Sequence, residues 1–223
     1  KERLFTMQHV DKVAVIATED DRTKMIASRI NHRLMRVSSK QVGDQSRWPS
    51  LQGPHNAQNV AAARAVAEVL GIKASTIEEA LHTYPGLPHR MERVRELGGV
   101  VYVNDSKATN PTSTAPALAA FPAIHWILGG RAKTSELDAC VPYFGHVRAA
   151  YTIGESAGMF ASLLKGSMPV SECGSLDIAV RAASKAAVAG ETVLLSPACA
   201  SFDQFTDFEA RGDAFRVAVE ALA

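Results

Sequence analysis

The stretch "DSKATN" at residues 105–110 gathers groups that bind charged ligands, and it directly follows the apolar, strand-like run "VVYVN". Five polar side chains occupy its six positions: Asp105, Ser106, Lys107, Thr109 and Asn110. An ammonium group beside hydroxyls, a carboxylate and a carboxamide can recognise a carboxylate or a phosphate. If this segment only connected the strand to the next helix, a glycine and a helix cap would be enough. The stretch therefore predicts a ligand site.

Two further strand-like runs end in polar sequence. "HWIL" is followed by "GGRAK", which ends at Lys133, and "VLLS" is followed by "PACASFDQF". Ligands of open α/β sheets bind outside the carboxyl ends of the strands, so the three runs predict one crevice. The simpler alternative makes Asp105, Lys107 and Lys133 solvated loop residues. In that alternative Asn110 caps the next helix, and Pro111 lies in its first turn.

Alternation of strands and helices after residue 87 predicts the fold that positions these runs. Strand-like runs at 124–129, 149–154, 168–173 and 192–197 alternate with helix-like runs at 111–121, 155–164, 175–189 and 211–222. We expect an α/β, Rossmann-like, doubly wound domain with a mostly parallel sheet. A hairpin that turns at Gly98 and Gly99 adds an antiparallel edge strand. "YPGLPHR" at 84–90 marks the domain boundary, giving domains 1–86 and 87–223.

The first 86 residues predict a smaller α/β part. Strands are expected at 12–17 and 34–39, a helical stretch at 20–34, a polar loop at 40–54, and helices at 56–72 and 75–84. Ser75 and Thr76 are candidate caps of the last helix, with Glu78 and Glu79 in its first turn. The opening "KERLFTMQ" is helix-like without a start signal, which predicts a chain entered in mid-domain.

Two candidate contacts lie outside the strand ends. Asn56 and Asn59 are three residues apart, so they share a helical face, and carboxamides can pair with an adenine edge. Alternatively, Asn56 is only the N-cap of its helix. Arg90, beside His89 at the domain boundary, could reach a phosphate or could be a surface charge.

Two motifs suggest other functions and fail on detail. "GGRAKTS" lacks the glycine that a Walker A motif requires before its lysine, because Ala132 precedes Lys133. "GESAG" at 154–158 matches the G-x-S-x-G of serine hydrolases, with Ser156 as nucleophile. No histidine follows Ser156, so the usual Ser-acid-His order cannot be completed, and Gly154 and Gly158 are expected to serve helix entry and packing.

Composition excludes several classes of function. The 223 residues carry a net charge of +1 without a basic cluster, which argues against nucleic acid as a partner. No apolar run is long enough for membrane insertion. Cys140, Cys173 and Cys199 lack metal-type spacing and are expected to be reduced thiols of a cytoplasmic protein.

Five stretches, in order and at family-like spacing, resemble the Mur ligases, and among them the D-glutamate-adding members. They are "GPHNAQN", "GLPHRMERV", "VNDSKATNPTST", "LGGRAK" and "LLSPACASFDQFTDFEARGDAF". The resemblance runs from about residue 53 to the end, and more loosely from Lys1. It implies that ATP, with Mg²⁺, phosphorylates the carboxylate of UDP-N-acetylmuramoyl-L-alanine. D-glutamate then attacks the acyl phosphate to form an amide in peptidoglycan precursor synthesis.

The resemblance also implies roles for single residues. Asn56 and Asn59 contact adenine, Arg90 and Asp105 hold phosphate and ribose, and Lys107 lies near the reacting carboxyl and phosphate. Lys107, Asp105 and Arg90 are thus the catalytic candidates. The D-glutamate pocket comprises Lys107, Thr109, Lys133, Ser201, Phe208 and the backbone of Phe202. Lys1 matches a carbamylated lysine that helps hold a second Mg²⁺.

The chain departs from the family pattern at its front. No P-loop and no UDP-sugar domain occur in these residues, and the 40–54 loop is short. The resemblance therefore implies that 1–86 is the C-terminal half of the central P-loop-type ATP-binding domain and 87–223 the C-terminal domain. We expect a monomer that is inactive alone. A non-catalytic nucleotide- or amino-acid-binding module on the same fold is the alternative.

Overall fold

The computed structural model describes residues 2–223 and divides the chain into two compact units, Lys1–Pro85 and Gly86–Ala223. Lys1, the expected metal-site lysine, lies outside the described residues. None of the helices within 2–223 is long and apolar enough to cross a membrane.

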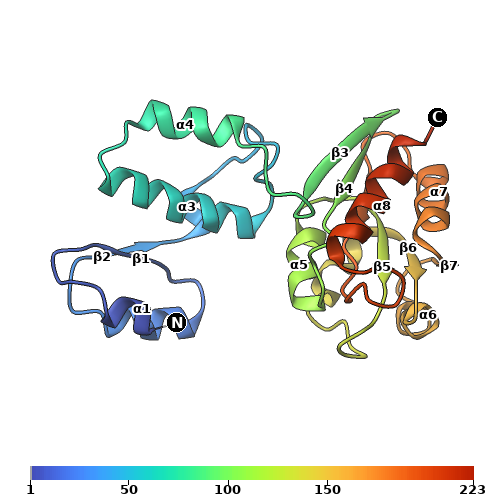
Figure 1. Ribbon diagram of the computed structural model, residues 1–223, viewed down its shortest axis with the longest axis horizontal. Coiled ribbons are helices and arrows are strands. Elements are labelled where there is room, and N and C mark those ends of the chain that lie inside the picture. The colour runs from blue at the N-terminus through green and yellow to red at the C-terminus, as the bar shows by residue number, and fades with distance from the viewer. Residues whose placement is uncertain (1) are drawn as a thin grey trace. The chain divides into compact units, whose positions relative to one another are not determined.

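A six-stranded sheet with the order β3-β4-β8-β5-β6-β7 forms the centre of the second unit (Figure 1). Its strands are β3 (Glu92–Leu97), β4 (Val100–Asn104), β5 (Ile124–Gly129), β6 (Val147–Ile153), β7 (Val170–Gly174) and β8 (Thr192–Leu195). β3 pairs antiparallel with β4 through the hairpin at Gly98 and Gly99, and all other pairs are parallel. The predicted fold class, with its antiparallel edge strand, is confirmed.

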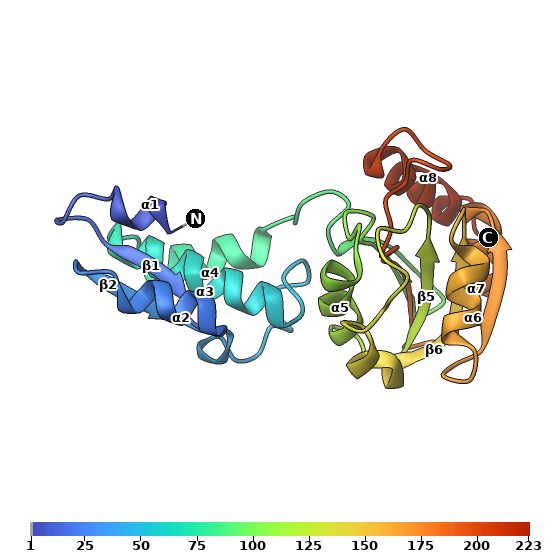
Figure 2. The same cartoon turned by 90° about the horizontal axis from the view of Figure 1, so that it is seen from below.

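Helices cover both faces of this sheet, as an alternating pattern requires. They are α5 (Pro111–Ala119), η2 (Val141–His146), α6 (Ala157–Leu164), α7 (Leu176–Ala186) and α8 (Phe208–Glu220). Figure 2 shows α5 and α7 on opposite sides of β5. α5, η2 and α6 pack on one face, and α7 and α8 pack on the other.

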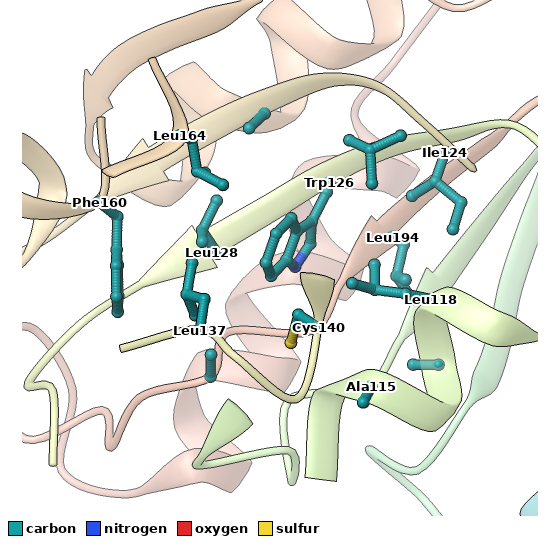
Figure 3. Packing of buried hydrophobic residues seen from close by; sticks show 14 of the residues in the cluster. Ala115, Leu118, Ile124, Trp126, Leu128, Leu137, Cys140, Phe160, Leu164 and Leu194 are labelled. Atoms are coloured by element: carbon teal, nitrogen blue, oxygen red, sulfur yellow. The ribbon is translucent and has the colours of Figure 1, made fainter. Parts of the chain in front are cut away.

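Each face buries its own apolar cluster, because successive strand residues point to opposite sides. On the α5 side the fully buried Trp126 lies among Leu128, Cys140 and Leu194 (Figure 3). Its indole Nε1 donates to the Ser196 carbonyl at 2.7 Å, which satisfies the one polar atom of the ring. The packing fixes β5 beside β8 and so fixes the loops that leave both strands.

The other face is closed by α7 and α8. Ile127 and Leu195 of the sheet meet Val180 of α7 and Phe215 of α8, all of them fully buried. Burying an aliphatic or aromatic side chain stabilises a fold by about 1.5–3 kcal/mol, so these contacts hold α8 in place. This matters for the site because Phe208 is the first residue of α8.

The first unit has a two-stranded parallel sheet, β1 (Ala14–Ala17) with β2 (Leu34–Val37). Its helices are α1 (Arg3–Thr6), α2 (Asp21–Ser28), η1 (Ser39–Gln41), α3 (Pro54–Val69) and α4 (Ala74–Thr83). Buried Ala61 and Ala65 of α3 pack on Val37. Buried Trp48 packs on Val60 below the guanidinium of Arg64.

Three predictions for the first unit are wrong in detail. α2 ends at Ser28, six residues before the predicted end, where the Ser28 hydroxyl donates to the Met25 carbonyl. The cap of α4 is Lys73, whose extended backbone accepts from the Thr76 amide, so Ser75 and Thr76 lie within the helix. The first turn of α4 consequently contains no acidic residue, and Glu78 forms ion pairs with Arg47 and Arg64 instead.

Candidate functional site

The carboxyl ends of β4, β8 and β5 are adjacent in the sheet, which brings the three polar runs together as predicted. The Asp105 amide donates to the Leu195 carbonyl at 2.7 Å, which joins the loop after β4 to β8. Arg131, after β5, forms an isolated bridge with Ala200, after β8. Ser106 Oγ donates to the carbonyl of Phe208, which brings in the start of α8. One cluster therefore draws on four segments.

Asp105 is buried within this cluster and is held on both carboxylate oxygens. It accepts from the Met91 amide at 3.2 Å and from the Ser196 hydroxyl at 2.8 Å. Burial raises its pKa from 3.8 to about 7, although these hydrogen bonds and the charge of Arg90 act in the opposite direction. The solvated-loop alternative is therefore wrong for Asp105. Its carboxyl group changes protonation near neutral pH.

Lys107 and Phe208 meet directly. The Lys107 ammonium lies 3.4 Å from the centroid of the Phe208 ring, a cation–π contact between a half-buried lysine and the first residue of α8. The Lys107 backbone amide donates to the His89 carbonyl at 3.0 Å. Within residues 2–223 no carboxylate pairs with this ammonium. Its charge is thus stabilised by a ring face, which a ligand carboxylate could replace.

The other pocket candidates differ in exposure. Ser201 is buried, the adjacent Phe202 is 64% exposed, and Thr109 is half-buried. Lys133 is exposed on the loop after β5, and no ion pair engages it among the residues that the structure describes. The structure thus places a buried hydroxyl, a half-buried lysine and an exposed lysine on neighbouring loops.

Arg90 lies on a strained turn. Its neighbours His89 and Met91 both have positive φ, 60° and 49°, which is uncommon for residues with a side chain. Asn104 Nδ2 donates to His89 Nδ1 at 3.1 Å, and a Cβ on Gly212 would lie only 2.1 Å from the same nitrogen. The turn is therefore locked by its surroundings, while the Arg90 side chain itself is exposed.

Arg211 is a part of this site that the sequence reasoning did not single out. It is 1% exposed, and its guanidinium donates to Ser106 Oγ at 3.0 Å, to the Ser106 carbonyl at 2.8 Å and to the Cys199 carbonyl at 3.1 Å. Burial lowers its pKa to about 10. Arg211 thereby ties the loops after β4 and β8 to α8. Its sequence context "EARGD" resembles an exposed helix surface and carries no signal of burial.

In the first unit, Asn56 and Asn59 share one face of α3, as their spacing predicted. Asn59 Nδ2 donates to Asn56 Oδ1 at 3.3 Å, and Asn56 Nδ2 donates to the Gln52 carbonyl at 3.0 Å. The alternative in which Asn56 is the N-cap is wrong. That position belongs to Gly53, whose φ of 89° suits glycine, and Pro54 follows it.

The remaining alternatives are decided by hydrogen bonds. Asn110 caps α5 by accepting from the Ser113 amide at 2.9 Å, and Pro111 is the first helical residue, so the capping interpretation is confirmed. Ser156 is buried, and its hydroxyl donates to the Gly130 carbonyl at 2.6 Å. The same hydroxyl accepts from the Ala132 amide at 3.1 Å, so both described partners of Ser156 Oγ are backbone groups of one loop.

Cys140, Cys173 and Cys199 are unpaired thiols, as expected. Burial raises the pKa of Cys140 and of Cys199 to about 12, so neither is a thiolate at neutral pH. Across residues 2–223 no three His, Cys, Asp or Glu side chains cluster in a way that could hold a metal ion.

The second unit is a doubly wound α/β domain with cations and hydroxyls at three adjacent strand ends, and its similarity to known proteins gives the family. Residues 89–199 match the family model "Mur ligase, glutamate ligase domain". The chain is 57% identical to the UDP-N-acetylmuramoylalanine–D-glutamate ligase of Sphingopyxis alaskensis, over 100% of this chain and 53% of that protein. It is 55% identical to the protein of that name from Novosphingobium aromaticivorans, covering 51% of it. The chain belongs to the Mur ligase family.

Solved structures agree at the level of the fold. A UDP-N-acetylmuramoylalanyl-D-glutamyl-2,6-diaminopimelate–D-alanyl-D-alanyl ligase from Acinetobacter baumannii matches 99% of this chain and 54% of its own, with a TM-score of 0.66 at 15% identity. A bifunctional folylpolyglutamate synthase/dihydrofolate synthase from Yersinia pestis, complexed with AMPPNP and Mn, matches 94% of this chain and 53% of its own. Its TM-score is 0.59 at 17% identity. The chain spans about half the length of the curated relatives that it matches.

Proposed function

We propose that this chain is part of an ATP-dependent ligase that adds D-glutamate to UDP-N-acetylmuramoyl-L-alanine through an acyl phosphate. The observation that carries the proposal is the cluster at the ends of β4, β8 and β5, in a chain 57% identical to a D-glutamate ligase. Lys107 there has no carboxylate partner among the described residues, and Asp105 titrates near pH 7. An unpaired lysine and an aspartate with a shifted pKa are both typical of a site that binds a charged ligand.

The division of labour follows the two units. Residues 1–86 are proposed to be the C-terminal half of the central ATP-binding domain, and 87–223 the C-terminal domain. For the amino acid, the ammonium groups of Lys107 and Lys133 would pair with the carboxylates of D-glutamate. Ser201 and Thr109 would offer hydroxyl groups, while Phe208 and the backbone of Phe202 would border the ligand.

ATP supplies the phosphoryl group that activates the acceptor carboxylate. Each unit by itself presents groups that suit part of a nucleotide. In the first unit Asn56 and Asn59 present carboxamides on one helix face, and in the second Arg90 presents an exposed guanidinium. The ionised carboxylate of Asp105 would accept a hydrogen bond from a ribose hydroxyl. Lys107 would stabilise negative charge on the carboxyl and phosphoryl oxygens as it develops. Mg²⁺ belongs to the proposal, but no cluster within 2–223 is assigned to it, and Lys1 stays a prediction.

A monomeric, cytoplasmic protein remains part of the proposal. The alternative is a non-catalytic module that binds a nucleotide or an amino acid on the same fold. Nothing in the cluster specifically favours it, since a lysine near a reacting carboxyl serves either role. The two functions differ in whether bound D-glutamate is consumed.

A chimera tests the proposal directly. The part of the Sphingopyxis alaskensis relative that this chain does not cover, which the resemblance implies is the amino-terminal half, is joined to the 223 residues. With ATP, Mg²⁺, UDP-N-acetylmuramoyl-L-alanine and D-glutamate, we expect ADP and the amide to form in step. The 223-residue chain without the added half should not turn over, because it contains no P-loop. A folded chimera that binds D-glutamate without forming amide would support the binding module instead.

A further inference from the structure

The turn Gly154–Ser156 after β6 belongs to the "GESAG" motif and has no role in the proposed function. Ser156 is 6% exposed. Its hydroxyl donates to the Gly130 carbonyl at 2.6 Å and accepts from the Ala132 amide at 3.1 Å. Both partners lie on the loop after β5, and Lys133 is the next residue. The serine therefore holds the backbone that presents Lys133.

This loop is in turn joined to the loop after β8. The Arg131 amide donates to the Ala200 carbonyl at 2.9 Å, and the Ala200 amide donates back at 3.0 Å. The backbones are so close that a Cβ on Gly130 would lie 2.3 Å from the Ala200 oxygen. A shift of the Gly130 carbonyl would thus displace Ala200, which precedes Ser201.

A second connection runs from the same turn to the loop before α8. The Glu155 amide donates to Asp203 Oδ2 at 2.9 Å. A Cβ on Gly154 would lie 2.1 Å from that oxygen, and the φ of Gly154 is 68°, so glycine leaves the space that the carboxylate occupies. Asp203 lies between Ser201 and Phe208. Its bond to the turn therefore anchors the segment that carries both.

We propose that Gly154–Ser156 is a positioning element of the amino-acid pocket, in which Ser156 places the Lys133 loop and Asp203 fastens the 201–208 loop to the turn. This inference rests on the proposed function. It explains a G-x-S-x-G sequence without a histidine, since the serine acts as an internal clamp rather than as a nucleophile. The pair between Arg131 Nε and Glu155 Oε2, at 3.1 Å, is exposed on both sides and adds little.

Amide hydrogen exchange on the 223-residue chain tests the clamp without requiring activity. Ser156→Ala removes the acceptor of the Ala132 amide, so that amide should exchange about 10-fold faster or more, with a small change in melting temperature. The control is Ser162→Ala, because the exposed Ser162 hydroxyl only donates to the Gly158 carbonyl of its own helix. Equal exchange at Ala132 in wild type and Ser156→Ala would overturn the proposal.

Kinetics in the chimera separate positioning from general damage. Ser156→Ala and Asp203→Ala should raise the KM for D-glutamate about 5- to 30-fold, while the KM for ATP stays within about 2-fold. Asp203→Asn keeps an oxygen that can accept from the Glu155 amide, so it should restore the D-glutamate KM. An unchanged D-glutamate KM, or equal losses for both substrates, would overturn the positioning role. An unsubstituted chimera that folds but shows no turnover would count against the proposed function alone, because the exchange experiment is independent of activity.

Discussion

Polar groups lie at both ends of the second unit's sheet, and the two ends differ in how completely those groups are paired. Near the amino ends of β5 and β8, His125 bonds Tyr151 Oη through Nδ1 and Glu191 through Nε2, each at 2.9 Å. Glu191 also accepts from the Val188 amide and pairs with Arg148. At the carboxyl ends, the ammonium of Lys107 rests on the Phe208 ring instead of a carboxylate.

This contrast separates a structural cluster from a ligand site. Buried polar groups that satisfy one another stabilise the native arrangement and leave nothing for a ligand. At the carboxyl ends, the cations on neighbouring loops have no carboxylate partner and lie beside an aspartate whose pKa is raised to about 7. These groups remain available to bind a ligand. Substitutions at the carboxyl ends should therefore alter ligand use, and substitutions at the amino ends should alter only stability.

The largest expected effect is the pH dependence of stability from Asp105. Burial raises its pKa in the folded protein from 3.8 to about 7, so the folded state binds the proton more tightly than the unfolded state does. The free energy of unfolding should therefore be highest below pH 4 as far as this group is concerned, and should fall as pH rises to about 7. The loss is about 4 kcal/mol.

Asp105→Asn removes this titration while it keeps an acceptor for the Met91 amide. Denaturant unfolding of the 223-residue chain and of the variant at several pH values gives the difference. We expect the stability of wild type relative to the variant to fall between pH 4 and 7. Parallel profiles would show that Asp105 is not desolvated as described.

Lys107→Ala in the chimera should lower kcat/KM for D-glutamate by about 10- to 150-fold, because a charged contact contributes about 1.5–3 kcal/mol. The melting temperature should change little, since Lys107 is on a loop and its removal opens no core cavity. Lys185→Ala, an exposed lysine in the last turn of α7, is the control. Normal D-glutamate kinetics with a lowered melting temperature would make Lys107 structural.

His125→Ala should lower stability and leave the D-glutamate kinetics nearly unchanged, the opposite of Lys107→Ala. It leaves Tyr151 and Glu191 without their shared partner at a buried position, which should cost about 2–3 kcal/mol of unfolding free energy. Tyr151→Phe removes only the hydroxyl and should cost about 1 kcal/mol. Chemical denaturation measures both. Any change in D-glutamate KM beyond about 2-fold would contradict the view that this end of the sheet is purely structural.

Lys133→Ala should lower kcat/KM for D-glutamate by about 10-fold, less than Lys107→Ala does, because the Lys133 ammonium is exposed and solvent weakens its contact. The KM for ATP should not change. Lys165→Ala, another exposed lysine, is the matched control. Equal effects of the two substitutions would remove Lys133 from the pocket.

Much of the second unit was predictable, because the hydrophobic pattern of its runs and the turn and cap residues between them indicate the same boundaries. The hairpin at Gly98 and Gly99 follows from its glycines, and the limits of β5 follow from the strand-like run "IHWILG". The capping of α5 by Asn110 is likewise a local signal. One failure, the end of α2 at Ser28, came where a local side-chain bond competed with helical spacing.

In the site, only the residues that directly follow a strand were predictable from the sequence. Asp105 and Lys107 follow a strand directly, so topology brings them to the crevice. Arg211 was missed because its partners, Ser106 and Cys199, are 105 and 12 residues away in the chain. Nothing local distinguishes a helix arginine that faces inward from one that faces solvent. The role of Ser156 likewise depends on the backbone of another loop, which no motif records.

In the proposed function, the carboxyl ends of β4, β5 and β8 bind the amino acid and the amino ends do not. NMR amide shifts of the 223-residue chain, titrated in parallel with D-glutamate and L-glutamate, test it most directly. We expect D-glutamate-specific shifts confined to residues 105–109, 130–133 and 199–208, with residues 123–125, 148–151 and 188–191 unchanged. Shifts centred on His125 and Glu191, or the same shifts with both enantiomers, would contradict it.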